Sequence, residues 1–205
     1  MTAVPRFVLA SASPARLKVL RAAGLDPEVV VSGVDESGVL GSPEEVALTL
    51  ATRKAEAVAA GLGGPPALVL GCDSVLELDG EAFGKPVNAP EAVSRWRRMR
   101  GRSGILHTGH CLIDTSTGRR VADVASTTVH FADLSDGEVT AYVGTGEPLH
   151  VAGAFTIDGL GGPFVDRIEG DPHNVVGVSL PLLRRLLRLH HVTVPQLWDD
   201  TNFPR

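Results

Sequence analysis

The chain is poor in several features, and each shortage excludes a class of protein. Only two cysteines occur among its 205 residues, Cys72 and Cys111, and both lie in apolar strand-like runs. We therefore expect buried free thiols and no disulfide framework. No apolar run approaches the roughly 20 residues that a membrane-spanning helix needs, and the N-terminus lacks the pattern of a signal peptide. The sequence predicts a cytoplasmic protein that contacts no membrane.

Positive charge is also scarce. The formal net charge is −5, which argues against a protein that coats nucleic acid, although local basic groups can still bind one polyanionic small molecule. The basic run 95–100 is better explained as the solvated face of a helix. The seven histidines are dispersed and form no zinc-binding pattern. The Gly-Cys-Asp-Ser run at 71–74 has the wrong spacing for a serine hydrolase.

What the chain does have is the composition of a globular protein, with 43% hydrophobic and 21% charged residues. Its length suits one sizeable core or two lobes around a cleft. Strand-like and helix-like segments follow one another without an internal repeat or a separating linker. We therefore predict an α/β fold with one central sheet, formed by residues 1–205 as a single domain.

Helix starts are the clearest local signals. A helix is predicted from Ser13-Pro14 to about Gly24, with Arg16 on its polar side. A longer helix is predicted from Ser42 to about Gly61, because serine followed three residues later by glutamate is a capping box. The remaining predicted elements are strands at 6–10, 27–32, 105–113, 122–131 and 164–168, and helices at 90–99, from 135, and at 180–189.

The stretch 67–85 contains residues with a clear chemical meaning. An apolar run leads to Asp73, which we predict at the end of a buried strand, and a hairpin at Asp79-Gly80 leads on to Lys85. A carboxylate at a strand end beside a cleft can hold a divalent metal or take a proton from water. Asp-Gly and Gly-Lys pairs also form ordinary hairpins, so this stretch alone leaves both interpretations open.

Basic and hydroxyl groups could form an anion site. Backbone N–H groups at a helix start bind anions, and Ser11, Ser13 and Arg16 add donors to the first predicted helix start. The alternative there is a capped surface helix. Lys54 and Lys85 lie on two further elements, and a triphosphate needs cations that converge from several directions. Most lysines simply solvate a surface, so convergence stays open.

Three carboxylates follow apolar runs. Asp35, Glu36 and Asp73 could meet at one edge of the sheet and hold magnesium or manganese, with water completing the coordination shell. The alternative is that they are solvated loop acids.

Several segments form an ordered series along nearly the whole chain. They are LASASPARLKVL (9–20), VDE (34–36), LATRKA (50–55), GCDSVLELDGEAFGKP (71–86), AVSRWRRMRGR (92–102), TGHCLI (108–113), GEPLHVAGAFTIDGLGG (146–162) and IEGDPHNVVGVSLPLL (168–183). In this order, the series resembles the Maf family of nucleoside triphosphate pyrophosphatases.

The resemblance implies a mixed central sheet flanked by helices, with two lobes around a nucleotide-binding cleft, in a protein that is often a homodimer. It implies hydrolysis of a canonical or modified nucleoside triphosphate to monophosphate and pyrophosphate, dependent on Mg²⁺ or Mn²⁺. Asp73 matches the family's catalytic aspartate, and Asp35 matches a family acid with Glu36 beside it. The positions that look like triphosphate contacts are Ser11, Ser13, Arg16, Lys54 and Lys85.

Three positions depart from the subgroup patterns that specify the base. Pyrimidine-directed members resemble Ser-Pro-Arg-Arg, Asp-Thr and Ile-Gln-Gly, where this chain has Ala15, Ser74 and Asp158. It also fits the 7-methylguanosine-directed pattern poorly. An ionised carboxylate only accepts hydrogen bonds, which suits guanine or cytosine better than uracil or thymine. We predict a preference away from dTTP and UTP; the alternative is that Asp158-Gly159 merely shapes a turn.

Other functions stay open at this point. One is a regulator of cell division or septation that acts by binding a partner or a nucleotide. Another is a nucleotide-binding module without turnover, against which the set Asp73, Lys54 and Lys85 argues. A third is an enzyme like inosine triphosphatase, with the same chemistry and a different base pocket.

Overall fold

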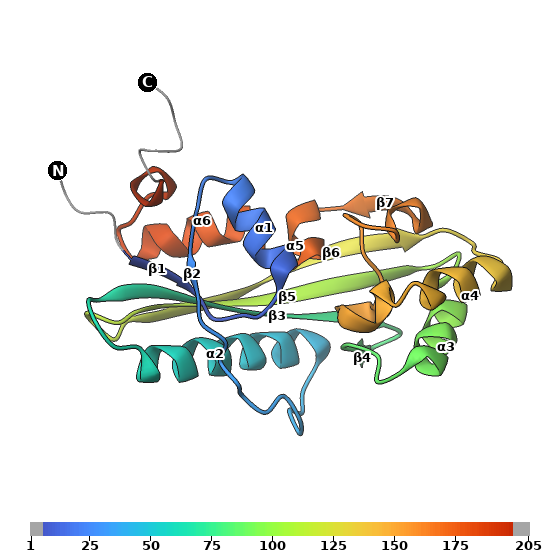
Figure 1. The fold of residues 1–205 in the computed structure, drawn as a ribbon, viewed down its shortest axis with the longest axis horizontal. Helices are drawn as coiled ribbons and strands as arrows, with labels where there is room; N and C mark the ends of the chain where they lie inside the picture. Colours follow the sequence, from blue (N-terminus) through green and yellow to red (C-terminus); the bar gives the residue numbers. More distant parts are fainter. Residues whose placement is uncertain (1–5, 199–205) are drawn as a thin grey trace.

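The computed structural model describes residues 6–198, and its centre is one mixed sheet (Figure 1). The strand order is β2-β1-β3-β5-β6-β7, with β4 paired to β3. β1 is parallel to β2 and β3, and the remaining pairs are antiparallel. The strands are β1 (Arg6–Leu9), β2 (Glu28–Val29), β3 (Ala67–Leu78), β4 (Glu81–Phe83), β5 (Ser103–Asp114), β6 (Arg120–Phe131) and β7 (Val165–Glu169).

Helices cover both faces of this sheet. α2 lies along one face, α1, α5 and α6 lie on the other, and α3 and α4 lie at the far end (Figure 1). No helix within residues 6–198 is long and apolar enough to cross a bilayer. The helices are α1 (Pro14–Ala22), α2 (Pro43–Gly61), α3 (Ala89–Met99), α4 (Asp136–Gly144), α5 (Pro172–Val176) and α6 (Leu180–Leu189), with short 3₁₀ turns η1 (Glu147–His150), η2 (Ala152–Ala154), η3 (Gly162–Phe164) and η4 (Val194–Leu197).

Two hydrophobic clusters at opposite ends of the sheet form the two lobes. The first packs β1 and the start of β3 against α1 and α6, around side chains such as Leu20 and Leu183. The second surrounds Trp96, whose ring meets Phe131 and Tyr142 edge to face and whose Nε1–H donates to Ala154 O at 2.8 Å. The prediction of a mixed sheet flanked by helices in two lobes is confirmed.

Local sequence signals define the helix starts. The Ser13 side chain accepts from Arg16 N, and Ser42 exchanges hydrogen bonds with Glu45 as a capping box. Both cysteines are free and buried, as predicted. The strand predicted at 27–32 is shorter, since only Glu28–Val29 pairs with β1.

The prediction that Asp73 ends its strand is wrong. Asp73 lies in the middle of β3, which continues to Leu78 because β5 pairs with it from residue 68 to residue 77. The neighbour on the other side changes instead: β1 pairs only with Ala67–Leu70 of β3, and β4 only with Leu76–Leu78. Within the described chain, residues 71–75 therefore have no strand along that edge.

The basic run at 95–100 is engaged within the protein. Each of its arginines contacts an acid, Arg95 within the same helix and the other three on neighbouring segments, and two of the four also lie over the ring of Phe83. The pairs are Arg95–Glu91, Arg97–Asp136, Arg98–Glu81 and Arg100–Asp136. Most of this positive charge is thus balanced locally, which favours the helix-face interpretation.

A buried histidine joins β5 to the start of α6. His110 Nε2 accepts from Ser179 N at 2.8 Å, and Nδ1 lies 2.9 Å from Thr108 O. A carbonyl oxygen only accepts, so Nδ1 carries the hydrogen and the ring is neutral. Burial lowers the pKa of His110 to about 4.

Stability should therefore depend on pH through His110. Between pH 6.5 and 4 the unfolded chain binds a proton at this ring and the folded chain does not, so stability present above pH 6.5 is lost as the pH falls. This loss amounts to up to about 3 kcal/mol. His110→Gln should flatten this part of the profile in urea titrations at several pH values. The exposed His150→Gln should keep it, and an unchanged slope in His110→Gln would contradict the assignment.

Candidate active site

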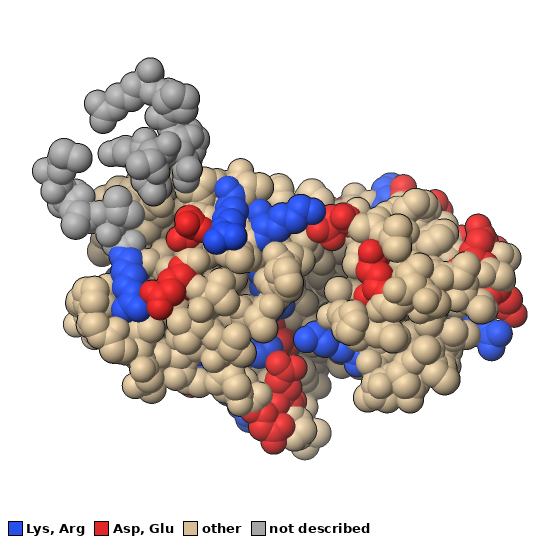
Figure 2. All heavy atoms as spheres, in the orientation of Figure 1, with Lys and Arg blue, Asp and Glu red and all other residues tan. Residues whose placement is uncertain are grey.

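The uncovered edge of β3 is the natural place for a ligand. β1 and β3 are parallel neighbours, and the chain leaves β1 for α1 on one face but enters β3 from α2 on the other (Figure 1). Ligands of open α/β sheets bind at such a switch point, outside the carboxyl ends of the strands. Figure 2 shows basic and acidic side chains together in a notch between the two halves of this face.

The alternation of side chains along β3 separates two contacts. Gly71 and Asp73 face α2, whereas Ser74 faces α1 on the opposite side of the sheet. Asp73 Oδ1 meets Lys54 Nζ of α2 at 2.5 Å, and Lys54 Nζ also meets Glu36 Oε1 at 2.7 Å. The structure therefore brings three of the predicted site residues into one cluster, with a buried ammonium between two carboxylates.

The electrostatics of the two carboxylates differ. Burial raises the pKa of Asp73, although the charges of Lys54 and Arg16 oppose the shift. Burial would also raise the pKa of Glu36, but the hydrogen bond from Lys54 and the charges of Lys54, Lys85 and Arg16 together lower it. The pKa of Asp73 is thus raised from its usual value while that of Glu36 is lowered. A raised pKa is the property that a carboxylate needs to accept a proton.

Two glycines let α2 approach the sheet closely enough for this contact. A Cβ at position 71 would lie 2.3 Å from Ala51 O, and one at position 109 would lie 2.3 Å from Ala47 O. Both distances are impossible for real atoms, so the backbone of α2 lies directly on β3 and β5 at these positions. Lys54 lies on the same helix, and the close approach of α2 brings its ammonium group to the Asp73 carboxylate.

Arg16 is buried, so the prediction of a polar-side position is wrong. Its Nε donates to Gly177 O at 2.8 Å, one terminal nitrogen donates to Ser11 Oγ at 3.0 Å, and the other donates to Ser74 Oγ at 3.1 Å. Ser13 caps the same helix and its N–H donates to Ser11 Oγ. The segment after β1 therefore carries a guanidinium, two hydroxyls and a helix start together.

Lys85 comes from the second lobe. It is exposed on the segment between β4 and α3, and its charge helps to lower the pKa of Glu36. The segment is anchored because Gly84 O accepts from both Arg95 and Gly153 N. Together with Arg16 and Lys54, Lys85 gives one cation on each of three elements around Asp73 and Glu36.

Asp35 does not join this cluster. It is exposed, and its Oδ1 accepts from Ser37 N at 2.9 Å in a local turn, which lowers its pKa. Among residues 6–198 no group of three His, Cys, Asp or Glu side chains is placed to hold a metal ion. The described structure therefore places Glu36 and Asp73 together but leaves Asp35 apart.

The three positions predicted to select the base lie in two environments. Ser74 is tied to Arg16 on the α1 side of the sheet. Asp158 is exposed, and its Oδ2 lies 3.6 Å from Lys18 Nζ of α1. Ala15 and Lys18 are three residues apart in α1, so they share one helix face. The contact of Lys18 thus brings the helix of Ala15 and the segment of Asp158 next to each other.

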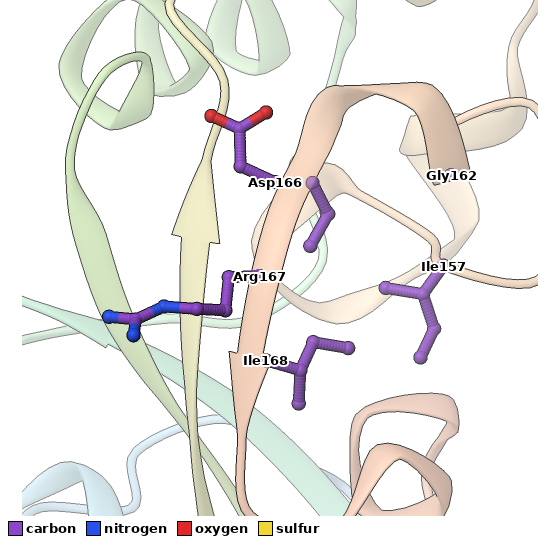
Figure 3. A pocket seen from close by; sticks show the side chains of 6 residues that line it. Ile157, Gly162, Asp166, Arg167 and Ile168 are labelled. Carbon is purple, nitrogen blue, oxygen red and sulfur yellow. The ribbon is translucent and has the colours of Figure 1, made fainter.

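A shallow hollow beside β7 begins next to Asp158 but is a separate feature (Figure 3). Ile157 and Ile168 lie on either side of it, whereas the Asp166 carboxylate and the Arg167 guanidinium point away. Converging polar groups are what fix a ligand in a pocket. The hollow lacks them, and none of the predicted site residues lines it.

Comparisons with known proteins identify the family of this chain. The family model described as Maf-like protein matches residues 6–190. The chain belongs to the Maf family. A curated relative from Salinispora tropica, named nucleoside triphosphate pyrophosphatase, is 63% identical over 200 residues, which is 95% of this chain and 88% of the relative.

Two further Maf-family relatives carry the same name. The relative from Streptomyces coelicolor is 59% identical over 97% of this chain and 98% of its own. The relative from Thermosynechococcus vestitus is 54% identical over 88% of this chain and 91% of its own. The resemblance drawn from the ordered motifs is thereby confirmed.

Some residues around this candidate site could not be predicted from the sequence. Thr108 and Asn174 support Ser74 from behind, through hydrogen bonds between segments far apart in the chain. No local pattern identifies such contacts. Gly71 and Gly109 could have been found, because a glycine inside an apolar strand often marks a close backbone approach.

The close approach of α2 can be tested at Gly71. Gly71→Ala should lower the free energy of unfolding by about 1–3 kcal/mol, because the new methyl group collides with the helix backbone. It should also lower kcat/KM, because Lys54 moves with α2. Gly61→Ala has no neighbour within 4 Å and serves as the control. Urea unfolding and steady-state kinetics measure both effects; a Gly71→Ala variant as stable as the parent would contradict this account.

Proposed function

We propose that this protein is a nucleoside triphosphate pyrophosphatase, which hydrolyses a nucleoside triphosphate to the monophosphate and pyrophosphate. The observation that carries the proposal is the buried contact between Lys54 and Asp73 at the uncovered edge of β3, with Arg16 on the other side of the strand. The Maf-family relatives that bear this name support it. The unit that performs the reaction is the chain 1–205 as one domain.

The reaction assigns a role to each group. A water molecule attacks the α-phosphorus, its proton passes to Asp73, and the electrons of the broken P–O bond leave with pyrophosphate. Asp73 can accept the proton because burial raises its pKa. Lys54 holds the carboxylate in place, and Arg16 and Lys85 stabilise the charge that develops on the leaving group. Ser11 and Ser13 add donors for the phosphates beside the start of α1.

The proposal includes a divalent cation, Mg²⁺ or Mn²⁺. Magnesium is commonly held by one or two carboxylates together with substrate phosphates. Asp73 and Glu36 lie close together, because both contact the same Lys54 ammonium. These two residues therefore fit a cation that arrives with the nucleotide. When bound, the cation would neutralise phosphate charge. Asp35 lies outside this set.

The family resemblance extends the proposal to the protein's setting. We propose that the enzyme acts in the cytoplasm as a homodimer. A role in cell division is compatible with turnover. A folded variant that lacks activity but keeps the cellular effect would separate the two functions.

Asp73→Asn is the direct test of the proposed reaction. It removes the proton acceptor but keeps the size of the side chain, so pyrophosphate release should fall by at least about 100-fold. Folding should be harmed far less than turnover. The assay measures pyrophosphate from a panel of canonical and modified triphosphates with Mg²⁺ or Mn²⁺, and circular dichroism checks the fold.

Asp79→Asn is the matched control. Asp79 is exposed in the β3–β4 hairpin at φ 55°, a conformation that asparagine tolerates. It should keep full activity. A folded Asp73→Asn enzyme that is fully active would overturn the mechanism. Silence of the folded parent protein across the panel would instead favour a regulatory or binding function.

We further propose that Asp158 helps to select the base. Its turn is held rigidly, because Glu147 accepts from the Tyr142 and Thr156 hydroxyls and from the N–H groups of Leu160 and Gly161. A carboxylate accepts hydrogen bonds only, and guanine and cytosine present donors to it.

Substrate preference should follow from this carboxylate. We expect GTP, CTP or 7-methyl-GTP to be turned over better than dTTP and UTP, and Asp158→Gln to shift relative kcat/KM toward dTTP and UTP by about tenfold. Asp166→Gln, on exposed β7, should change nothing. Equal or better turnover of dTTP by the parent enzyme would reject the assignment.

A further inference from the structure

The hydrogen bonds behind Arg16 run in one direction. Each hydroxyl has a single hydrogen to donate. The Thr108 hydroxyl donates to Asn174 O at 3.1 Å, so the 3.0 Å contact between Ser74 Oγ and Thr108 Oγ1 must use the hydrogen of Ser74. Ser74 Oγ then accepts from Arg16 at 3.1 Å. Donation passes from Arg16 to Ser74, from Ser74 to Thr108, and from Thr108 to the α5 backbone.

The far end of this chain is fixed. Thr108 and Asn174 are fully buried. The Asn174 amide nitrogen lies 3.0–3.2 Å from three acceptors, Leu106 O, Ala125 O and Thr127 Oγ1, which share its two hydrogens. These bonds fasten α5 to β5 and β6, so the carbonyl that receives the Thr108 hydrogen has one position. A buried, directed hydrogen-bond network specifies one geometry for the group at its other end.

The near end of this hydrogen-bond chain is the buried guanidinium of Arg16. Among the described residues, three of its five N–H groups have partners: Gly177 O, Ser11 Oγ and Ser74 Oγ. The remaining two lie on the two terminal nitrogens and are free for phosphate oxygens. A guanidinium binds phosphate through such paired donors, and its orientation decides whether both can engage.

We propose that Thr108 is a positioning residue for the triphosphate, acting through Ser74 to orient Arg16. The proposal rests on the proposed function, since it concerns the same substrate. It also changes the interpretation of Ser74. Because its only hydrogen is committed to Thr108, Ser74 serves Arg16 as an acceptor and has no donor to offer a base.

Thr108→Val tests this series of hydrogen bonds, because it removes the hydroxyl with almost no change of side-chain volume. It leaves Ser74 without its acceptor, so Arg16 should lose its fixed orientation. We expect KM and the dissociation constant of a non-hydrolysable α,β-methylene triphosphate to rise about tenfold, with a smaller change in kcat. Thr108→Ser restores the hydroxyl and should restore both constants to within about twofold. Thr128→Val, on the opposite face of β6, is the control.

A double variant shows whether Thr108 acts through Arg16. In an Arg16→Lys background the hydrogen bonds of Thr108 and Ser74 have no guanidinium to orient. Thr108→Val should then change the dissociation constant of the analogue by less than about twofold. An equal effect in both backgrounds would overturn the proposal. So would a packing signature, in which Thr108→Ser destabilises the fold while Thr108→Val leaves binding unchanged.

The two proposals fail separately. If the parent enzyme releases pyrophosphate but Thr108→Val keeps the parent constants, the positioning role is overturned and the function stands. If the parent protein binds the analogue without turnover and Thr108→Val weakens that binding, the positioning role stands and the enzymatic function is overturned. If the parent protein neither hydrolyses triphosphates nor binds the analogue, both are overturned.

Discussion

The structure depends on the placement of one ammonium group between two carboxylates. Lys54 is buried, and a buried charge is stable only when its partners are close and well oriented. Asp73 and Glu36 provide this, the first from the middle of the sheet and the second from the loop between β2 and α2. The arrangement holds a helix, a strand and a loop in one geometry. It also places the buried carboxylate of Asp73 beside the uncovered edge of β3.

That geometry needs an opening in the sheet. β1 stops pairing with β3 at Leu70 and β4 begins at Leu76, so the five residues between them have no strand on that edge in the described chain. A continuous neighbour would have covered Asp73. Because β5 pairs with the opposite edge over the same stretch, the strand stays rigid where it is uncovered. The uncovered residues therefore stay ordered. The candidate site is built on a strand, which positions side chains better than a loop does.

Sequence reasoning succeeded where structure is local and failed where it is not. The Ser42 capping box and the Asp79-Gly80 hairpin involve neighbours along the chain, so their signals lie within a few residues. The position of Asp73 in the middle of β3 depends on pairing with β5, which lies beyond β4 and α3 in the chain. The burial of Arg16 also depends on distant residues, because a carbonyl at Gly177 and a hydroxyl at Ser74 replace water around its guanidinium.

The adjacent pair Asp73-Ser74 shows how a strand can organise a site from both faces. Successive side chains of a strand point in opposite directions, so Asp73 receives the cation of α2 while Ser74 receives the cation of α1. One two-residue segment thus sets the separation of Lys54 and Arg16. With Ser74 committed to this task, we propose that selection of the base falls to the segments where Lys18 contacts Asp158. Under this proposal, phosphate binding and base selection can change independently, because they depend on different residues.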